Sequence, residues 1–213
     1  MGLCKKMKKG LFITFEGGEG GGKSTQIKKA AAFFKKNDRK VLILREPGGT
    51  RISEAIREII LNKNFTEMAD PTELLLYLAA RAQIVQEKIL PALKKGTVVI
   101  CDRFEDSTLA YQGYGRGLSI KGIQKVSELF ARNKFQPDLT ILLDIDPREG
   151  MKRGGRHDRM ERQSYLFHRR VRRGFLDLAR KNPKRIRVIH AALPIEKVAA
   201  QVQKVLEKCL RKK

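Results

Sequence analysis

The chain has 213 residues, 41% of them hydrophobic, and its 46 lysines and arginines against 23 aspartates and glutamates give a formal charge of +23. This length and apolar content predict one folded domain over residues 1–213. No apolar run approaches the roughly 18 residues of a membrane helix, and the basic start lacks the apolar stretch of a secretory signal. We therefore expect a cytoplasmic protein without a membrane partner.

The cysteines and the charge narrow the function classes further. Cys4, Cys101 and Cys209 are odd in number and lack metal-ligand spacing, which argues against a disulfide framework or a zinc site. Residues 148–187 contain 15 basic and 4 acidic residues, so the positive charge is locally concentrated. Such a segment predicts either a nucleic-acid surface or a lid that closes over phosphate groups.

The start of the chain alternates strand-like and helix-like segments. Residues 11–16 are β-prone and run into a glycine cluster, after which residues 23–36 have the apolar spacing of a helix. A second strand is predicted at 40–44, followed by a Pro-Gly-Gly break and a helix at 52–61.

A long, mostly apolar helix is predicted at 72–90, because Pro71 suits a first turn and Pro91 should stop the helix. Arg81 lies near its middle. An arginine in an apolar helix is costly to bury unless it has a partner.

The rest of the chain continues the alternation. Further strands are predicted at 97–101, 139–143 and 185–189, and further helices at 120–133, 161–179 and 195–210. Five β-prone segments separated by helices predict an α/β fold with a five-stranded parallel sheet flanked by helices. Ligands of such sheets bind at the carboxyl ends of the strands.

A phosphate-binding loop follows the first predicted strand. Residues 17–24 read GGEGGGKS, which matches the pattern G-x-x-x-x-G-K-[ST] between a strand and a helix. Glycines let backbone N–H groups approach phosphate oxygens, and the helix N-terminus adds a positive dipole. The expected ATP-binding residues are Gly17, Gly18, Glu19, Gly20, Gly21, Gly22, Lys23, Ser24 and Thr25.

Two side chains of this loop have distinct expected roles. Lys23 would neutralise charge between the β- and γ-phosphates, and the Ser24 hydroxyl would bind the Mg²⁺ that bridges them. Asp102 and Arg103 follow the third predicted strand, which places them at the same sheet edge. Asp102 could then complete the metal site, or cap a helix, and Arg103 could grip a second phosphate with its two-pronged guanidinium.

Several segments together resemble bacterial-type thymidylate kinase, a P-loop nucleoside monophosphate kinase family. They are residues 15–19 (FEGGE), 45–50 (REPGGT), 79–81 (AAR), 102–104 (DRF), 107–108 (ST) and 110–113 (AYQG). The resemblance covers nearly the whole chain. It implies the P-loop NTPase fold with a basic lid, a homodimer, and Mg²⁺-dependent phosphorylation of dTMP to dTDP by ATP for dTTP synthesis.

The resemblance also implies a role for individual residues of the acceptor site. Arg103 would grip the dTMP phosphate with Arg45 nearby, and Glu19 would meet the 3′-hydroxyl group. Tyr77, which stands where most relatives have phenylalanine, would stack on thymine, and Tyr111 would disfavour ribose. Arg81 and Thr108 would hydrogen-bond the base, and Gln112 would lie in the same pocket. Taken alone, Tyr77 could equally pack in the core, and Arg81 could pair with a carboxylate.

The lid is expected at about residues 150–160, where the sequence is rich in arginine and has paired glycines that allow hinging. Phosphoryl transfer needs cations around the transferring group. Because residues 18–21 contain no arginine, the resemblance implies that the lid supplies it, and Arg153 and Arg156 are the candidates. For Arg162, Arg169, Arg170, Arg172 and Arg173 we expect a solvated basic face instead.

The predicted catalytic residues are thus Lys23, Arg103, Arg153 and Arg156. One alternative keeps the enzyme class and changes the acceptor to dUMP or another pyrimidine nucleoside monophosphate. A different alternative is a P-loop ATPase that binds nucleic acid, suggested by the +23 charge. It would need a binding module, and no residues are left over for one, so we expect no specific nucleic-acid partner.

Overall fold

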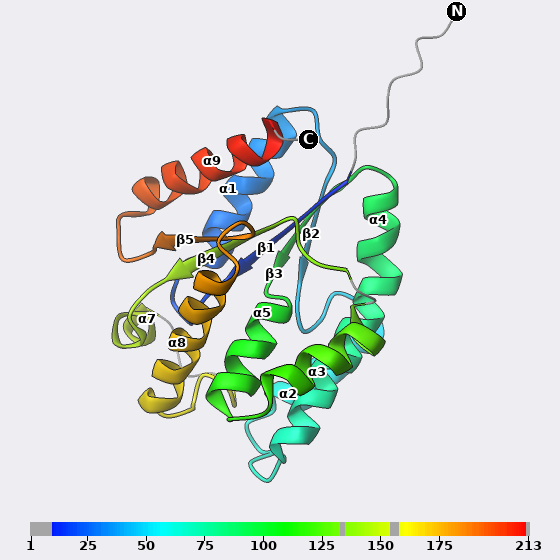
Figure 1. Cartoon of the computed structure of the whole chain (residues 1–213), viewed down its shortest axis with the longest axis vertical. Helices are drawn as coiled ribbons and strands as arrows, with labels where there is room; N and C mark the ends of the chain where they lie inside the picture. Colours follow the sequence, from blue (N-terminus) through cyan, green and yellow to red (C-terminus); the bar gives the residue numbers. More distant parts are fainter. Residues whose placement is uncertain (1–9, 133–134, 154–157, 212–213) are drawn as a thin grey trace, which may run out of the picture.

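The computed structural model describes residues 10–132, 135–153 and 158–211. Its five strands form one parallel sheet in the order β2-β3-β1-β4-β5 (Figure 1). The strands are β1 (Leu11–Glu16), β2 (Val41–Arg45), β3 (Val98–Asp102), β4 (Leu139–Asp144) and β5 (Ile186–His190). Each lies within one residue of its predicted bounds, and the predicted five-stranded parallel sheet is confirmed.

Alternating side chains of the central strands pack against opposite helix layers. Leu11, Ile13 and Phe15 of β1 join the core under α1 (Lys23–Lys36) and α9 (Ile195–Arg211), while Phe12 points to the other face. Both faces are buried because a parallel sheet is covered by its own crossover helices. The helices α1 and α9 lie side by side over one face in Figure 1.

The remaining helices include those that cover the other face and those that line the candidate site. They are α2 (Arg51–Leu61), α3 (Asp70–Ile84), η1 (Val85–Ile89), α4 (Leu90–Lys94), α5 (Glu105–Thr108), η2 (Leu109–Gly115), α6 (Ile120–Val126), η3 (Ser127–Ala131), α7 (Pro147–Arg153) and α8 (Tyr165–Lys181). Among them, α8 packs against η2, and α2 packs against α3. Among the described residues, no helix combines the length and apolar character needed to cross a bilayer.

Pro91 does not end the long helix, contrary to the sequence-based expectation. A wider π-helical turn, η1, interrupts the helix just before the proline, and the Leu90 amide donates to the Val85 carbonyl five residues back. The helix then continues as α4 with Pro91 in its first turn, a position where the missing proline N–H is tolerated. The shifted hydrogen-bond register therefore accommodates a residue that normally breaks a helix.

Three other segments differ from the predicted elements. The basic helix predicted at 161–179 begins at Tyr165, because the Ser164 side chain caps it by accepting from the Phe167 amide. The helical stretch α5–η2 and the short helix α7 were not predicted. In the first of these, polar residues alternate closely with small ones, so its sequence lacks the apolar periodicity by which helices are recognised.

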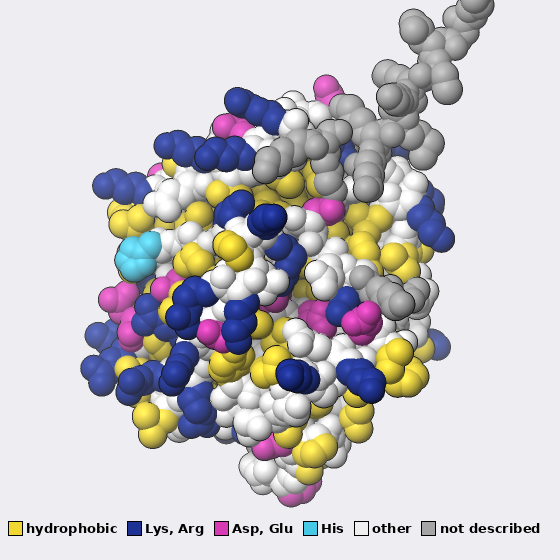
Figure 2. All heavy atoms as spheres, in the orientation of Figure 1, with side chains coloured by type: hydrophobic (Ala, Val, Ile, Leu, Met, Phe, Trp, Pro, Cys, Tyr) yellow, Lys and Arg dark blue, Asp and Glu magenta, His cyan; other side chains and the backbone are white. Residues whose placement is uncertain are grey.

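The basic segment after β4 forms part of the molecular surface. In Figure 2, lysine and arginine side chains gather over the region of α7 and α8. Two arginines expected to be merely solvated instead hold elements together. Arg170 donates to the Gly115 carbonyl, and Arg172 pairs with both Asp144 and Asp146, which ties α8 to the end of β4.

Register brings the predicted site to one sheet edge. Asp102 at the end of β3 is the parallel-strand partner of both Phe15 in β1 and Arg45 in β2. The loops that follow these three strands therefore start side by side. Cys101, one residue earlier, is completely buried, as expected of a small apolar core residue.

Candidate active site

The phosphate loop joins β1 to α1 in a conformation that only glycine adopts easily. Gly17 and Gly20 have φ angles of 130° and 67°. A Cβ atom at Gly17 would lie 2.3 Å from the Leu143 carbonyl oxygen, and one at Gly20 would lie 2.1 Å from the Gly150 carbonyl oxygen. Both backbone conformation and close packing therefore require these glycines.

Lys23, at the start of α1, is buried within this loop. Its Nζ donates to the carbonyl oxygens of Gly17 at 3.1 Å and Gly18 at 2.8 Å. Burial and the neighbouring Arg103 lower the pKa of Lys23. An anionic phosphate entering the loop would offset both effects, because its negative charge stabilises the charged ammonium group.

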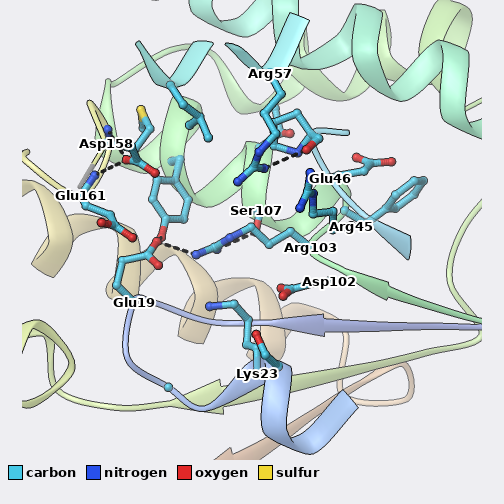
Figure 3. A pocket seen from close by; sticks show the side chains of 18 of the residues that line it. Glu19, Lys23, Arg45, Glu46, Arg57, Asp102, Arg103, Ser107, Asp158 and Glu161 are labelled. Carbon is cyan, nitrogen blue, oxygen red and sulfur yellow. Dashed lines mark hydrogen bonds and ion pairs between the residues drawn. The ribbon is translucent and has the colours of Figure 1, made fainter. Parts of the chain in front are cut away.

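Arg103 lies between the phosphate loop and the rest of the cavity (Figure 3). Its backbone has a φ of 69°, which is unusual for a residue with a side chain. The Nη1 atom donates to the Gly17 carbonyl at 3.0 Å and to the Ser107 hydroxyl at 3.2 Å, and Nη2 pairs with Glu19 at 2.5 Å. Burial opposes its charge, yet Glu19 holds the pKa of Arg103 well above its ordinary value.

Glu16, the last residue of β1, fixes the backbone next to Arg103 through hydrogen bonds. Its carboxylate accepts from the Phe104 amide at 2.8 Å and from the Ser107 hydroxyl at 2.5 Å. Burial and the nearby Asp106 raise the pKa of Glu16 to about 8. This carboxyl group therefore holds its proton more tightly in the folded chain than in the unfolded one.

The elevated pKa predicts a stability change with pH. Between pH 4.5 and about 8 the folded chain binds more protons at Glu16 than the unfolded chain, so this residue makes the free energy of unfolding fall as pH rises. Glu16→Gln should remove a slope of up to about 1.4 kcal/mol per pH unit in that window, measured by urea unfolding. The exposed control Glu58→Gln should keep the wild-type slope. Identical pH profiles for wild type and Glu16→Gln would contradict this account.

Glu19 lines the cavity and contacts two of the other side chains there. It accepts a hydrogen bond from the Tyr111 hydroxyl at 2.9 Å in addition to its ion pair with Arg103. Although burial opposes ionisation, Arg103 and Lys23 lower the pKa of Glu19 to about 2. The Arg103 guanidinium also lies 5.1 Å from the centre of the Tyr111 ring. These three side chains thus form one rigid wall, with an ionised carboxylate at neutral pH.

Arg81 has the partner that an arginine in an apolar helix requires. Its side chain is 1% exposed, its Nε pairs with Glu46 at 2.8 Å, and its Nη2 donates to the Thr108 hydroxyl at 2.9 Å. Burial raises the pKa of Glu46 to about 7, although Arg81 acts to lower it. Nη1 is buried and has no hydrogen-bond partner among the described residues. That nitrogen remains able to donate to a ligand.

Removing Arg81 alone is expected to lower the stability more than removing both charges of the Arg81–Glu46 pair. Arg81→Ala should lower the free energy of unfolding by about 3–5 kcal/mol, because it leaves a buried carboxylate unpaired. Adding Glu46→Gln should recover part of this loss without restoring activity, since the charge to be buried is gone but the ligand donor is still missing. Denaturant unfolding of the single and double variants checks this. A single variant as stable as wild type would contradict a structural role for the pair.

The other residues predicted to bind the acceptor nucleotide also line the cavity. Tyr77 lies one helical turn from Arg81 on α3, and burial raises its pKa. The Gln112 amide nitrogen donates to Glu73 at 2.8 Å, which fixes the orientation of the amide. Arg45 is more exposed and pairs with Glu54 at 2.7 Å. The side chain of Arg45 can therefore move more readily than that of Arg81.

Asp102 carries the feature expected of a metal-site carboxylate. It points toward the phosphate loop beside Lys23 in Figure 3, and its Oδ1 is buried without a hydrogen-bond partner in the described part of the chain. The described residues contain no cluster of three or more His, Cys, Asp or Glu side chains that could hold a metal by themselves. This arrangement fits Mg²⁺, which is usually bound by one or two protein ligands together with substrate phosphates and water.

Of the two candidate lid arginines, Arg153 lies among the described residues. Arg153, at the end of α7, lines the cavity and donates to the Ala191 carbonyl at 3.0 Å. Arg156 lies outside the described residues. Asp158, Met160 and Glu161, which come later in the sequence, also line the cavity.

A single cavity of about 480 Å³ collects most of these side chains. The predicted residues that line it are Glu19, Gly20, Gly21, Gly22, Lys23, Ser24, Thr25, Arg45, Tyr77, Arg81, Asp102, Arg103, Thr108, Tyr111, Gln112 and Arg153. Gly17 and Gly18 lie behind it as the acceptors of the Lys23 hydrogen bonds. The cavity size suits a small-molecule ligand site.

Sequence reasoning missed several lining residues. Arg57 of α2 enters the cavity with its Nη1 fixed to the Pro47 carbonyl at 2.8 Å, and Glu46, Ser107 and Glu161 also lie there. Arg57 follows Ser53 by four residues on one helix, and Ser53 is buried. That spacing puts Arg57 on the same face of α2 as Ser53. Only the structure shows that this face is buried, so no sequence pattern indicated that Arg57 points inward.

Known proteins resemble this chain over most of its length. A family model described as thymidylate kinase matches residues 15–202. The thymidylate kinase of Clostridium novyi is 45% identical over 94% of this chain and 100% of the relative. That of Bacillus licheniformis is 46% identical over 95% of this chain and 97% of the relative.

A solved structure agrees with these sequence matches. The crystal structure of thymidylate kinase from Ehrlichia chaffeensis superposes with a TM-score of 0.76 at 36% identity and covers 93% of this chain and 99% of that one. The fold is therefore the P-loop NTPase fold that the family resemblance implied, with the five-stranded sheet that the strand pattern predicted.

Proposed function

We propose that this chain, which belongs to the thymidylate kinase family, transfers the terminal phosphoryl group of ATP to dTMP and so forms ADP and dTDP for dTTP synthesis. One observation carries the proposal: Lys23 Nζ and Arg103 Nη1 both donate to the Gly17 carbonyl oxygen, at 3.1 and 3.0 Å. Two cations from different strand ends thus converge on one atom. Two phosphate groups held by them would lie next to each other in one cavity.

The donor nucleotide is bound by the phosphate loop. Backbone amides of Gly17, Gly18, Glu19, Gly20, Gly21, Gly22, Lys23, Ser24 and Thr25 surround its phosphates, and Lys23 neutralises charge between the β- and γ-phosphates. The Ser24 hydroxyl and the Asp102 carboxylate would hold Mg²⁺, which would neutralise charge on the phosphate oxygens. The unpartnered Asp102 Oδ1 supports this assignment.

The acceptor phosphate is gripped by Arg103, with Arg45 and Arg57 close by. Arg103 holds Gly17, Ser107 and Glu19 at once, so its guanidinium is already oriented before the substrate arrives. The second pKa of a phosphate monoester is about 6, so the attacking oxygen is ionised at neutral pH and needs no general base. Positioning and charge neutralisation then account for the reaction.

The nucleoside end of the acceptor lies deeper in the cavity. Glu19 accepts from the 3′-hydroxyl group, and Tyr111, held by Glu19, leaves little space at C2′. Tyr77 packs on the thymine ring, and Arg81 offers its unpartnered Nη1 to a thymine carbonyl. Gln112, whose amide nitrogen is held by Glu73, presents its oxygen to the base, with Thr108 beside it.

The lid completes the site. Arg153 and Arg156 approach the transferring phosphoryl group when the segment at about 150–160 closes over both nucleotides. Closure would also exclude water, which favours transfer to dTMP over hydrolysis. The position of Arg153 on the cavity wall supports its part in this step.

We extend the proposal to the state of the protein in the cell. Residues 1–213 act as one catalytic domain in the cytoplasm, and two copies form a homodimer. Large exposed apolar side chains on the neighbouring helices α2, α3 and η3 support the dimer. They are Ile52, Ile59, Leu75, Leu129 and Phe130. Sedimentation equilibrium should give a mass twice that of the chain.

A panel of acceptors under one ATP-coupled assay tests the function. We expect dTMP to be the best acceptor, and dUMP to have a kcat/KM about 10- to 200-fold lower because it lacks one methyl group in the base pocket. UMP should be poorer still, and AMP should not turn over. Faster turnover of dUMP than of dTMP would move the assignment to another pyrimidine nucleotide. ATP hydrolysis stimulated by DNA but not by dTMP would replace the kinase by a nucleic-acid-dependent ATPase.

A further inference from the structure

A second, smaller cavity lies between the loop that joins α2 to α3, the end of η2 and the residues that precede α8. It has a volume of about 250 Å³ and shares no lining residue with the substrate cavity. Its lining residues, which we call the anion pocket, are Lys63, Thr66, Met68, Arg116, Arg159, Arg162 and Gln163. Four of these side chains are cationic, and none carries a negative charge.

Two nearby carboxylates pair with arginines of the pocket. Glu73 pairs with Arg116 at 2.9 Å and with Arg159 at 2.6 Å, and Asp70 lies 3.3 Å from Arg116. Both acids are engaged with arginines of the pocket, and no acidic side chain among the described residues lines the pocket itself. Arg116 is fixed further, because its Nη1 donates to the Gln163 side-chain oxygen at 3.2 Å.

Arg159 offers a specific donor. The residue is 7% exposed, its Nε donates to the Ile60 carbonyl at 3.0 Å, and its Nη1 pairs with Glu73. Its third nitrogen, Nη2, is buried and has no hydrogen-bond partner among the described residues. Leaving a buried donor unpaired costs free energy, and more so for a charged group, so an acceptor at this place would be favoured.

We propose that the anion pocket binds a phosphate group, held by Arg159 together with Lys63, Arg116 and Arg162. Arginine forks match the oxygens of phosphate, and charge-assisted hydrogen bonds are the stronger ones. The volume is below the roughly 300–1,000 Å³ of sites that enclose a drug-sized ligand. The ligand is therefore inorganic phosphate or the phosphate group of a small ester, and not a whole nucleotide.

Thermal unfolding tests this binding without relying on the kinase reaction. The protein is first saturated with dTMP and ADP, so that the substrate cavity is filled, and is then titrated with sodium phosphate. Parallel samples receive sodium chloride at matched ionic strength. A ligand that binds the folded chain raises the unfolding temperature in a saturable way. We expect such a rise with phosphate beyond that with chloride.

Variants assign the effect to the anion pocket. Lys63→Gln/Arg162→Gln changes two exposed residues and should weaken phosphate binding at least about tenfold, because each residue loses a charged donor. Lys121→Gln/Arg173→Gln makes the same charge change at exposed positions outside the pocket, and it should bind phosphate like wild type. Both should unfold at the wild-type temperature without phosphate.

Glycerol 3-phosphate in place of phosphate identifies the source of the ligand. Binding of both compounds, weakened only by the pocket variant, shows that an ester's phosphate suffices. Binding of inorganic phosphate alone assigns the free ion. The proposal is overturned if phosphate and chloride act alike, or if the two double variants respond to phosphate equally.

Discussion

Replacing Lys23 with alanine is expected to lower kcat about 10³-fold, the loss found when one preorganised charge-stabilising donor is removed from a reaction centre. Lys23 is buried in the phosphate loop, and its ammonium group is held by the Gly17 and Gly18 carbonyl oxygens. Alanine leaves no cation near the developing charge on the transferred phosphoryl group. Steady-state turnover of dTMP with saturating ATP measures the effect.

The fold should survive this substitution. Burial opposes the charge of Lys23, as its lowered pKa indicates, so its removal should not lower the unfolding temperature. Lys28→Ala, an exposed position on the same helix, is the matched control and should keep wild-type activity. If Lys23→Ala retained more than about a tenth of the activity, the loop would not be the site of phosphoryl transfer.

Arg103→Ala is expected to lower kcat/KM for dTMP by about 10³-fold, because a cation at the transferring group is worth at least that much. The KM for dTMP should rise much more than the KM for ATP, since Arg103 approaches the phosphate loop from the acceptor side. Arg103→Lys keeps the charge but cannot hold Gly17, Ser107 and Glu19 together. Its activity should therefore fall between those of Arg103→Ala and wild type.

An exposed arginine on α8 controls for charge alone. Arg169→Ala removes one positive charge from the surface and should leave both KM values unchanged. Arg103→Ala with an unchanged dTMP KM and a raised ATP KM would contradict the assignment of Arg103 to the acceptor phosphate.

The sheet and the phosphate loop were accessible from the sequence, because both depend on local patterns. Each strand is a short run of apolar residues, and the glycine cluster follows the first of them directly. Parallel order then places the end of β3 beside the end of β1, so that Asp102 and Arg103 meet the loop. The motif and the topology together were enough to predict the convergence of the two cations.

Contacts between segments that are far apart in the sequence could not be predicted from local patterns. Arg81 lies 35 residues from Glu46, and neither residue signals the other, so the sequence left core pairing and ligand binding as equal alternatives for Arg81. The structure contains that pairing and also leaves Nη1 without a partner, so the two alternatives are compatible. Pro91 was misleading for a similar reason, because the π-helical turn that accommodates it has no sequence pattern of its own.

Buried ionisable side chains are the common feature of the site. Glu16, Lys23, Glu46, Arg81 and Arg103 are all largely enclosed, and each contacts a partner that fixes its position. Such groups are costly in a core but effective in a site, because they need not reorganise when the substrate's charge arrives. Stability and activity should therefore change independently in variants of these residues, as expected for Arg81→Ala with and without Glu46→Gln.

A crystal structure with dTMP, ADP and Mg²⁺ bound tests the central claim most directly. We expect the dTMP phosphate on Arg103, its thymine ring between Tyr77 and Arg81, and the ADP phosphates in the loop at 17–24. The dTMP phosphate and the ADP β-phosphate should face each other, with room for one phosphoryl group between them. A structure with dTMP bound elsewhere, and with side chains filling the space around Arg81, Arg103 and Tyr111, would contradict the account.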